Sequence, residues 1–285
     1  MGMLAKIWPK YTLADQAAFT FTHVGLIGIC LFELFVVLPI YHERFSTMFL
    51  VHLFSGLFIL YQVFTNMYSM ILTDTTSKSG SFNLPAVLLP DWKYCPVCQQ
   101  NVPPRSHHCK ICDACIIKRD HHCIFTGQCV GFLNHRYFIV MSSYLWLGCF
   151  YTVAFNHEYY FDILGGYRLS LIFHFLCPML AWISGYANSH QLMILVIGGV
   201  NLMAMFLFTC LMGFQLFFIS RGQTQFECKK KIRDYSKSFL ENWKVVLGHR
   251  WYLTWLSVTI DSPLPGNGTD FKKTHGVIEE NFKTI

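Results

Sequence analysis

The chain has 285 residues, of which 53% are hydrophobic, 17% aromatic and only 13% charged, and its formal net charge is +6. This composition is too apolar for an ordinary soluble protein, and long apolar runs account for the excess. The sequence therefore predicts a polytopic membrane protein, and nothing in it indicates a nucleic-acid partner.

The chain begins with a short segment, residues 1–16, and two apolar runs follow it. Residues 17–41 and 47–72 are each long enough to cross a bilayer core of about 30 Å, which takes roughly 20 helical residues. Together, 17–72 is predicted to be a transmembrane helical hairpin. No small-residue cleavage site follows the first run, so a removed signal peptide is not expected. Glu33 lies inside the first run, and a hydrogen bond between helices or a neutral carboxylic acid is favoured over a functional role for it.

Residues 73–136 contain a dense set of metal-ligand side chains. The segment reads Cys95-x2-Cys98, His107-His108-Cys109-x2-Cys112-x2-Cys115, Asp120-His121-His122-Cys123 and Cys129. A Cys-x2-Cys turn presents two thiolates to one tetrahedral zinc, and a structural zinc takes four cysteine or histidine ligands. Seven cysteines with two histidines exceed the eight ligands of two zinc ions by one. Cys123, directly after Asp-His-His, is the expected free thiol.

Two simpler interpretations compete with a reactive thiol. All of these residues could bind zinc and nothing more. Disulfides are less expected, because the segment lies in the most basic part of the chain, which should face the reducing cytosol. A RING-type ubiquitin-ligase module fits worse still, because its two sites need longer separations than the closely stepped cysteines here.

The segment resembles the DHHC-type protein S-acyltransferases, or palmitoyltransferases. The residues that carry the resemblance are Cys95-x2-Cys98, Pro104-Arg105-Ser106-His107-His108-Cys109, Cys112, Cys115, Asp120-His121-His122-Cys123, Cys129-Val130-Gly131, Asn134 and Phe138. The resemblance implies two structural zinc sites, one of Cys95, Cys98, His108 and Cys115, the other of Cys109, Cys112, His122 and Cys129. It also implies that Asp120, His121 and Cys123 are the catalytic residues.

The chemistry assigns a role to each member of this catalytic set. A neighbouring imidazole lowers the pKa of a thiol or takes its proton, so His121 is the expected base. Asp120 would fix the tautomer of that ring and stabilise the imidazolium. Cys123 would attack the thioester of palmitoyl-CoA, hold the acyl group and pass it to a cysteine of a substrate protein.

Residues 137–219 are predicted to return to the membrane. Within them, 137–157 and 191–219 are predicted spans, and 169–187 is an apolar stretch of uncertain role. Lysine and arginine concentrate in 73–136, with seven, and in 220–285, with eleven, and the N-terminal segment has two. This bias predicts that all three segments lie on the cytosolic side. Two crossings after the zinc module satisfy this bias, so 169–187 is predicted to be re-entrant, lumen-facing or interfacial.

The predicted cytosolic tail, 220–285, carries two motif-like stretches and a basic cluster. Thr224-Gln225-Phe226-Glu227 resembles the family's Thr-Thr-x-Glu motif, with Gln225 at the second threonine, and the stretch from Asn242 to Gly248 resembles its C-terminal element. The basic cluster favours an anchor to anionic lipid. The alternative is binding of CoA phosphates, for which the zinc module also has candidates. The cluster is Lys229, Lys230, Lys231, Arg233 and Lys237, and the candidates in the module are Arg105, Lys118 and Arg119.

The chain also departs from the family after the tetrad. Ile124-Phe125 stands where the family has Pro-Trp, and Gly127-Gln128 where it has Asn-Asn. Phe125 keeps an aromatic surface for acyl contact, but the preference for chain length cannot be carried over.

The prediction is an all-α polytopic membrane protein with four transmembrane helices and a small cytosolic two-zinc module. Its predicted function is S-acylation of membrane-proximal proteins with cytosolic cysteines, using acyl-CoA, in the Golgi or endoplasmic reticulum. The alternative is a catalytically weak, zinc-bearing membrane scaffold.

Overall fold

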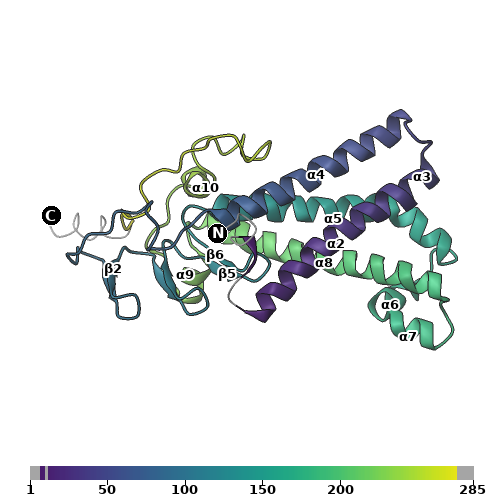
Figure 1. The fold of residues 1–285 in the computed structure, drawn as a ribbon, viewed down its shortest axis with the longest axis horizontal. Helices are drawn as coiled ribbons and strands as arrows, with labels where there is room; N and C mark the ends of the chain where they lie inside the picture. Colours follow the sequence, from purple (N-terminus) through teal and green to yellow (C-terminus); the bar gives the residue numbers. More distant parts are fainter. Residues whose placement is uncertain (1–6, 10–11, 275–285) are drawn as a thin grey trace, which may run out of the picture. The chain divides into compact units, whose positions relative to one another are not determined.

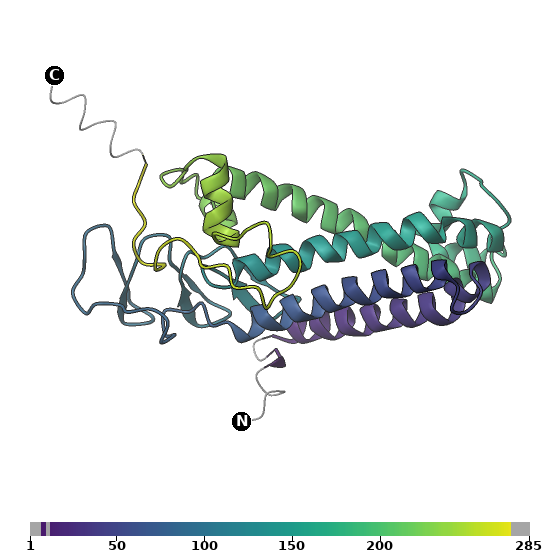
Figure 2. The same cartoon turned by 90° about the horizontal axis from the view of Figure 1, so that it is seen from above.

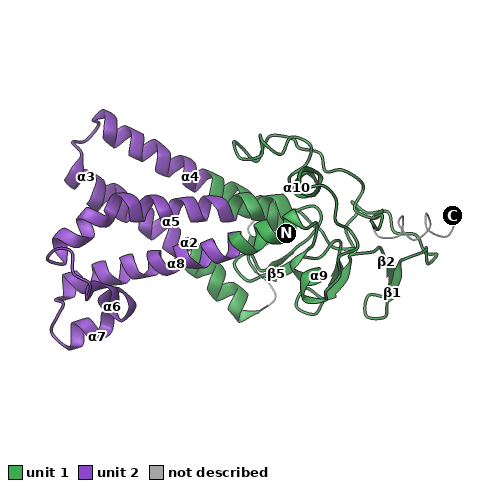
Figure 3. Cartoon of the chain, turned by 180° about the vertical axis from the view of Figure 1, so that it is seen from behind, with its two compact units in different colours: residues 1–23, 62–141, 213–285 green, residues 24–61, 142–212 purple. Residues whose placement is uncertain are grey.

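The computed structural model describes residues 7–9 and 12–274, which form two compact units (Figure 3). Unit 1 takes residues 1–23, 62–141 and 213–285, and unit 2 takes residues 24–61 and 142–212. Unit 1 contains all the short strands, and unit 2 is helical.

Four long helices account for the apolar runs of the sequence (Figures 1 and 2). They are α2 (Leu13–Phe32), which continues through a π-helical turn, η1 (Glu33–Val37), into α3 (Leu38–Tyr41); α4 (Thr47–Leu72); α5 (His135–Ile163); and α8 (Ser189–Ser220). In the described part of the chain, these four are the helices long and apolar enough to cross a membrane. The predicted fold class, an all-α membrane protein with four spans, is confirmed.

The apolar stretch 169–187 forms two short helices in unit 2. They are α6 (Leu171–Leu176) and α7 (Pro178–Ile183), of six residues each. At 1.5 Å per residue each is about 9 Å long, too short to span a bilayer. Pro178 lacks a backbone N–H, so it cannot continue α6, but it fits the first turn of α7.

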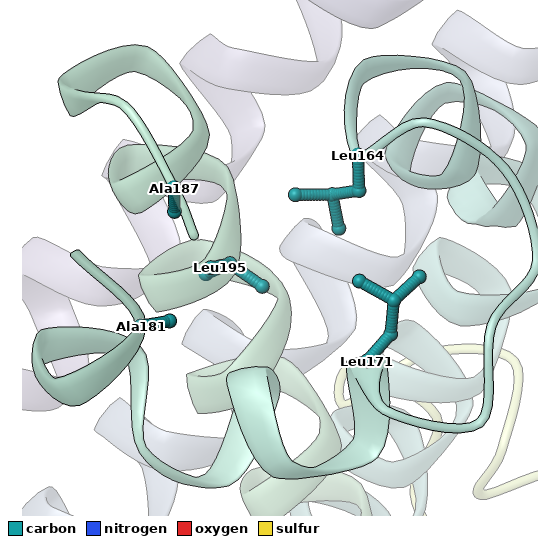
Figure 4. Packing of buried hydrophobic residues seen from close by; sticks show 5 residues of the cluster. All are labelled: Leu164, Leu171, Ala181, Ala187 and Leu195. Carbon is teal, nitrogen blue, oxygen red and sulfur yellow. The ribbon is translucent and has the colours of Figure 1, made fainter. Parts of the chain in front are cut away.

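These short helices are held by apolar packing within unit 2. Figure 4 shows the cluster, which consists of Leu164, Leu171, Ala181, Ala187 and Leu195. Helix α6 also approaches α8 closely, because a Cβ on Gly198 would lie 2.7 Å from the Phe175 ring and one on Gly199 would lie 2.6 Å from the Phe175 carbonyl oxygen. Larger side chains at these two glycines would push α6 away from α8.

A polar pair lies among the helices of unit 2. The Asn156 side-chain amide donates a hydrogen bond to the Glu33 carboxyl group, joining α5 to the start of η1. This contact agrees with the expectation that Glu33 makes a hydrogen bond between helices. A polar group inside a membrane-spanning segment needs such a partner, because lipid offers none.

The cysteine-rich part of unit 1 consists of three antiparallel hairpins. Strands β1 (Lys93–Cys95) and β2 (Gln100–Val102) form the first, β3 (His107–Cys109) and β4 (Ala114–Ile116) the second, and β5 (His121–Cys123) and β6 (Gln128–Val130) the third. The buried side chains at their centres are largely cysteines rather than large apolar groups. Such small hairpins need metal to supply the stability that a hydrophobic core would otherwise provide.

Two short helices follow α8 in unit 1. Helix α9 (Gln225–Lys229) and helix α10 (Phe239–Leu247) each begin with a capping box, made by Thr224 with Glu227 and by Ser238 with Glu241. The Asn242 amide donates to the Ser220 carbonyl at 3.0 Å, which ties α10 to the end of α8. Gly222 adopts a φ of +63°, and a Cβ there would lie 2.7 Å from Asn242 Oδ1, so this turn requires glycine.

Candidate active site and metal centres

The first candidate metal centre lies between the first two hairpins. Its four side chains are Cys95, Cys98, His108 and Cys115, whose ligand atoms all lie within 4.8 Å of one another. The strand register explains half of this set, because His108 is paired directly with Cys115 across β3 and β4. Nδ1 of His108 lies 3.3 Å from the Cys98 Sγ, so the imidazole points at the thiols.

The second centre uses the same construction one hairpin later. It gathers Cys109, Cys112, His122 and Cys129, and β5 pairs His122 with Cys129. Nδ1 of His122 lies 3.3 Å from the Cys112 Sγ and 3.7 Å from the Cys129 Sγ. The two groups interleave along the sequence, because the third hairpin closes a site that begins on the second.

Both groups have the chemistry of a structural zinc site. Each offers three thiols and one imidazole, and none of the chain's twelve cysteines forms a disulfide. The Sγ atoms of Cys112 and Cys129 are 3.6 Å apart. Two thiolates bound tetrahedrally to zinc with Zn–S bonds of about 2.3 Å would lie about 3.8 Å apart, so the spacing fits.

A carboxylate that the sequence analysis missed supports the second centre. Asp15, at the start of α2, is 1% exposed, and its Oδ1 lies 3.2 Å from Nε2 of His122. With Nδ1 directed at the thiols, Nε2–H is the group that donates to Asp15. Asp15 is itself held by Thr12, whose hydroxyl accepts from the Asp15 backbone N–H at 3.0 Å. A carboxylate on the far nitrogen of a metal-binding histidine fixes its tautomer and orientation.

The alternation of strand β5 separates metal binding from the candidate catalytic chemistry. Successive side chains of a strand point to opposite faces, so His121 and Cys123 share one face and His122 takes the other. His122 accordingly turns to the metal group, while the His121 ring and the Cys123 thiol are hydrogen-bond partners. A three-residue strand thus places a base beside a thiol and a metal ligand behind both.

Asp120 completes the chain of hydrogen bonds. Its Oδ2 lies 2.7 Å from Nδ1 of His121, which leaves the other ring nitrogen for the thiol. Cys123 is 4% exposed, and the His121 ring is partly exposed. Carboxylate, imidazole and thiol therefore lie in the order of an orienting group, a base and a nucleophile.

The electrostatic environment favours an ion pair between imidazole and thiol. Burial opposes protonation of His121, but its hydrogen bonds to Asp120 and Cys123 outweigh burial and raise the pKa of His121 to about 9. Burial would raise the pKa of the Cys123 thiol, yet the hydrogen bond and charge of His121 outweigh it, so that this pKa lies below its ordinary value. Burial likewise opposes ionisation of Asp120, and the hydrogen bond from His121 helps to lower its pKa well below the usual range.

Two further groups hold Asp120, and one of them was not predicted. The Gln215 amide, on α8, donates to Asp120 Oδ2 at 3.0 Å. The backbone N–H of Gln225, the first residue of α9, donates to Oδ1 at 2.7 Å. A backbone donor does not depend on the side chain, so glutamine in place of the family's threonine keeps this hydrogen bond. A polar amide within the apolar run of α8 was the only sequence signal for Gln215.

The predicted CoA-binding side chains occupy different environments. Arg105 is buried, and its Nε and Nη2 form a bidentate pair with Glu227 at 2.6 and 2.7 Å. Lys118 is buried and lines a cavity. Arg119 is half-buried and donates to the His108 carbonyl at 3.3 Å. Phe125 lies beside the thiol, where its backbone is a hydrogen-bond partner of Cys123.

Comparison with known proteins gives an assignment that agrees with this geometry. A family model described as DHHC palmitoyltransferase matches residues 89–232. The chain is 37% identical over 224 residues to the "Probable palmitoyltransferase ZDHHC24" of Danio rerio, covering 78% of this chain and 76% of that protein. It is 33% identical over 196 residues to the protein of the same name from Homo sapiens, covering 65% of this chain and 66% of that protein.

The structure and the comparisons agree on one assignment. Four apolar helices, two metal-binding groups of cysteine and histidine, and an intact Asp-His-His-Cys tetrad accompany a family match over half of the chain. The chain therefore belongs to the DHHC palmitoyltransferase family and is a protein S-palmitoyltransferase.

Proposed function

We propose that the chain transfers a palmitoyl group from palmitoyl-CoA to cysteines of substrate proteins through an acyl-enzyme on Cys123. The observation that carries this proposal is the hydrogen-bonded series of Asp120, His121 and Cys123. A scaffold that only needed zinc would use His122 alone of the tetrad. The retention of a carboxylate, a base and a buried thiol in contact therefore favours catalysis over the scaffold alternative.

The transfer takes two balanced steps. In the first, His121 takes the Cys123 proton, the thiolate attacks the thioester carbonyl carbon, and the bond from that carbon to the CoA sulfur breaks. His121 returns the proton to the departing CoA thiolate. In the second step, the substrate's thiol gives its proton to His121 and its sulfur takes the acyl group, and Cys123 leaves and is reprotonated. Asp120 holds the ring for both steps and stabilises its charged form.

Zinc fits both Cys3His groups and would contribute folding stability rather than chemistry. Neither Cys123 nor His121 belongs to a metal group, so the thiol stays available for acylation. Metal bound by the second group of ligands would link the second hairpin to the third. It would thereby fix the position of β5, which carries His121 and Cys123.

The proposed orientation places the site on the cytosolic side, at the membrane surface. Lysine and arginine concentrate in the zinc module and the tail, as cytoplasmic segments do. A long acyl chain gains about 0.8 kcal/mol for each CH₂ that it buries, while CoA and substrate thiols need water. The substrates would be membrane-proximal cysteines, and the compartment the Golgi or endoplasmic reticulum. CoA contacts by Arg105, Lys118, Arg119 and Phe125 stay predictions, of which Phe125, beside the thiol, is the best placed.

The test is transfer of a clickable palmitoyl group from its CoA thioester to the purified protein in detergent. We expect hydroxylamine-sensitive label on the wild-type protein and on Cys228→Ser, a control at a thiol outside the metal groups. The label should fall to the no-enzyme background in Cys123→Ser with its zinc content unchanged. Equal labelling of Cys123→Ser, or no label on zinc-loaded wild-type protein, would contradict the proposal.

A further inference from the structure

Unit 1 contains a cavity of about 60 Å³ beside the zinc module. Its walls come from the module, the turn after α8, helix α10 and the segment from Pro265 to Lys272. A buried water needs roughly 10 to 15 Å³ by this measure, so the cavity holds about four waters or one tetrahedral oxyanion. Neither Cys123 nor His121 lines it.

The lining is predominantly cationic. Arg105, Lys118, Lys237 and Lys272 all contribute to it, against the single carboxylate of Asp270. Lys237 and Lys272 are exposed. Glu227 pairs with Arg105 from outside the lining, which leaves three lysines against one carboxylate. Like charges gathered in a concave site are costly unless an anion compensates for them.

Arg105 is only partly satisfied by the protein. Its Nε and Nη2 donate to Glu227 and to the Gly222 carbonyl, but Nη1 donates to no acceptor among the described residues. Its guanidinium group stacks on Tyr235, 4.6 Å from the ring centre, and is thereby fixed in orientation. The two remaining N–H groups are therefore fixed donors.

Lys118 is the most deeply buried of the four. It is 3% exposed and lines the cavity. Burial and the nearby charge of Arg105 lower the pKa of Lys118 to about 7, although the charges of Glu227 and Asp120 act in the opposite direction. An ammonium group has three donors and is expensive to bury without acceptors, which an anion in the cavity would supply.

The cavity also adjoins the groups that hold the catalytic carboxylate. His135 lines it, and its Nε2 lies 3.3 Å from Oε1 of Gln215, whose amide donates to Asp120. Nδ1 of His135 is buried and has no hydrogen-bond partner among the described residues. A phosphate that keeps one proton has an O–H donor to offer it.

We propose that this cavity binds one phosphate group, free or on a lipid headgroup, at a site separate from that of the acyl donor; Arg105 and Lys118 would then serve this site instead of the CoA contacts predicted for them. The carrier is a small phosphate-bearing anion, held by Arg105 and Lys118 from the module and by Lys237 and Lys272 from the tail. Binding joins the tail to the module and supports the residues behind Asp120. The site goes beyond the proposed transfer reaction and does not need Cys123.

The experiment measures binding of radiolabelled inorganic phosphate to the full-length, zinc-loaded protein in uncharged detergent, at constant ionic strength. Lys118→Met should weaken binding about tenfold, since it removes a buried charge but keeps the length of the side chain. Lys272→Gln, at the exposed side, should weaken it several-fold with zinc content unchanged. Lys229→Met, an exposed lysine outside the cavity, is the matched control and should bind as the wild type does.

Two further measurements identify the molecule that carries the phosphate and show whether its binding is independent of acyl transfer. In phosphatidylcholine nanodiscs containing phosphatidylinositol 4-phosphate, lost phosphate binding would assign the site to a lipid headgroup, and retained binding to a free anion. Cys123→Ser should bind phosphate normally, even if the transfer reaction proves wrong. Three results would overturn the proposal: no saturable binding, equal binding by Lys118→Met, Lys272→Gln and Lys229→Met, or displacement of phosphate by CoA, which would make the cavity part of the donor site.

Discussion

Two histidines that are neighbours in sequence are held by carboxylates for different purposes. Asp120 holds His121, whose far nitrogen meets a thiol, and Asp15 holds His122, whose far nitrogen meets a metal group. Both carboxylates are almost fully buried, so solvent weakens neither contact. A buried carboxylate therefore orients a catalytic base, His121, in one case and a metal ligand, His122, in the other.

Asp15→Asn should speed loss of zinc from the second centre about tenfold, because an amide neither carries charge nor fixes the tautomer of His122 as a carboxylate does. Release of zinc to a chromogenic chelator would measure this, with half of the bound metal leaving in the faster phase. Asp113→Asn is the matched control at the first centre. Asp113 lies 3.7 Å from His108 but is 81% exposed, so its loss should change little. Equal release rates for the two variants would argue against a supporting role for Asp15.

Individual elements hold the site together through few, buried contacts. Helix α9 supplies the Gln225 backbone N–H to Asp120 and, two residues later, Glu227 to Arg105. The carboxylate of Glu227 also accepts the Thr224 backbone N–H, so it caps its own helix. A five-residue helix has little stability of its own, and these contacts are what keep it in place.

Glu227→Gln should destabilise the protein by about 3 to 5 kcal/mol, because it leaves the Arg105 charge buried without its partner. Denaturant unfolding in detergent would measure the change, and acyl-enzyme formation should fall with it because α9 also orders Asp120. Asp91→Asn makes the same chemical change in the exposed pair of Asp91 with Lys273 and should cost no more than about 1 kcal/mol. If Glu227→Gln also lowered the free energy of unfolding by no more than about 1 kcal/mol, other contacts would hold α9 in place.

The zinc groups were within reach of sequence reasoning, and the contacts behind them were not. Cys-x2-Cys turns and short hairpins bring ligands together over a few residues, so spacing and family resemblance sufficed to predict them. Asp15 reaches His122 across 107 positions, and Gln215 reaches Asp120 across 95. Such contacts follow from how the long helices meet the module, which no local pattern encodes. The pair of Arg105 with Glu227, 122 positions apart, was beyond reach for the same reason.

At the scale of the whole molecule, stability comes from two different sources. The helices of unit 2 bury apolar clusters such as that in Figure 4, and their backbone hydrogen bonds are internal. The hairpins of the module surround cysteines that could hold two metal ions, and bound metal would take the place of a core. The helices of unit 2 and the hairpins of the module should therefore unfold under different conditions.

Chelation of zinc should unfold the module while the long helices persist. We expect the far-ultraviolet circular dichroism of helices to change little in detergent, while limited proteolysis begins to cut within residues 89–132. The reason is that thiolate–metal bonds, rather than apolar burial, hold the hairpins. An unchanged cleavage pattern after complete removal of zinc would contradict this, and so would collapse of the helical signal.

The close spacing of the thiols has a consequence for how long the enzyme lasts. Seven cysteines lie between Cys95 and Cys129, and the sulfur atoms of Cys112 and Cys129 are already 3.6 Å apart. Bound to zinc, six of them are shielded; released in the presence of an oxidant, neighbouring thiols would close into disulfides about 2.05 Å long. Metal loss would then be reversible only in a reducing environment, and an oxidised module could not take zinc back. The working lifetime of the protein is thus tied to the redox state of the compartment that the module faces.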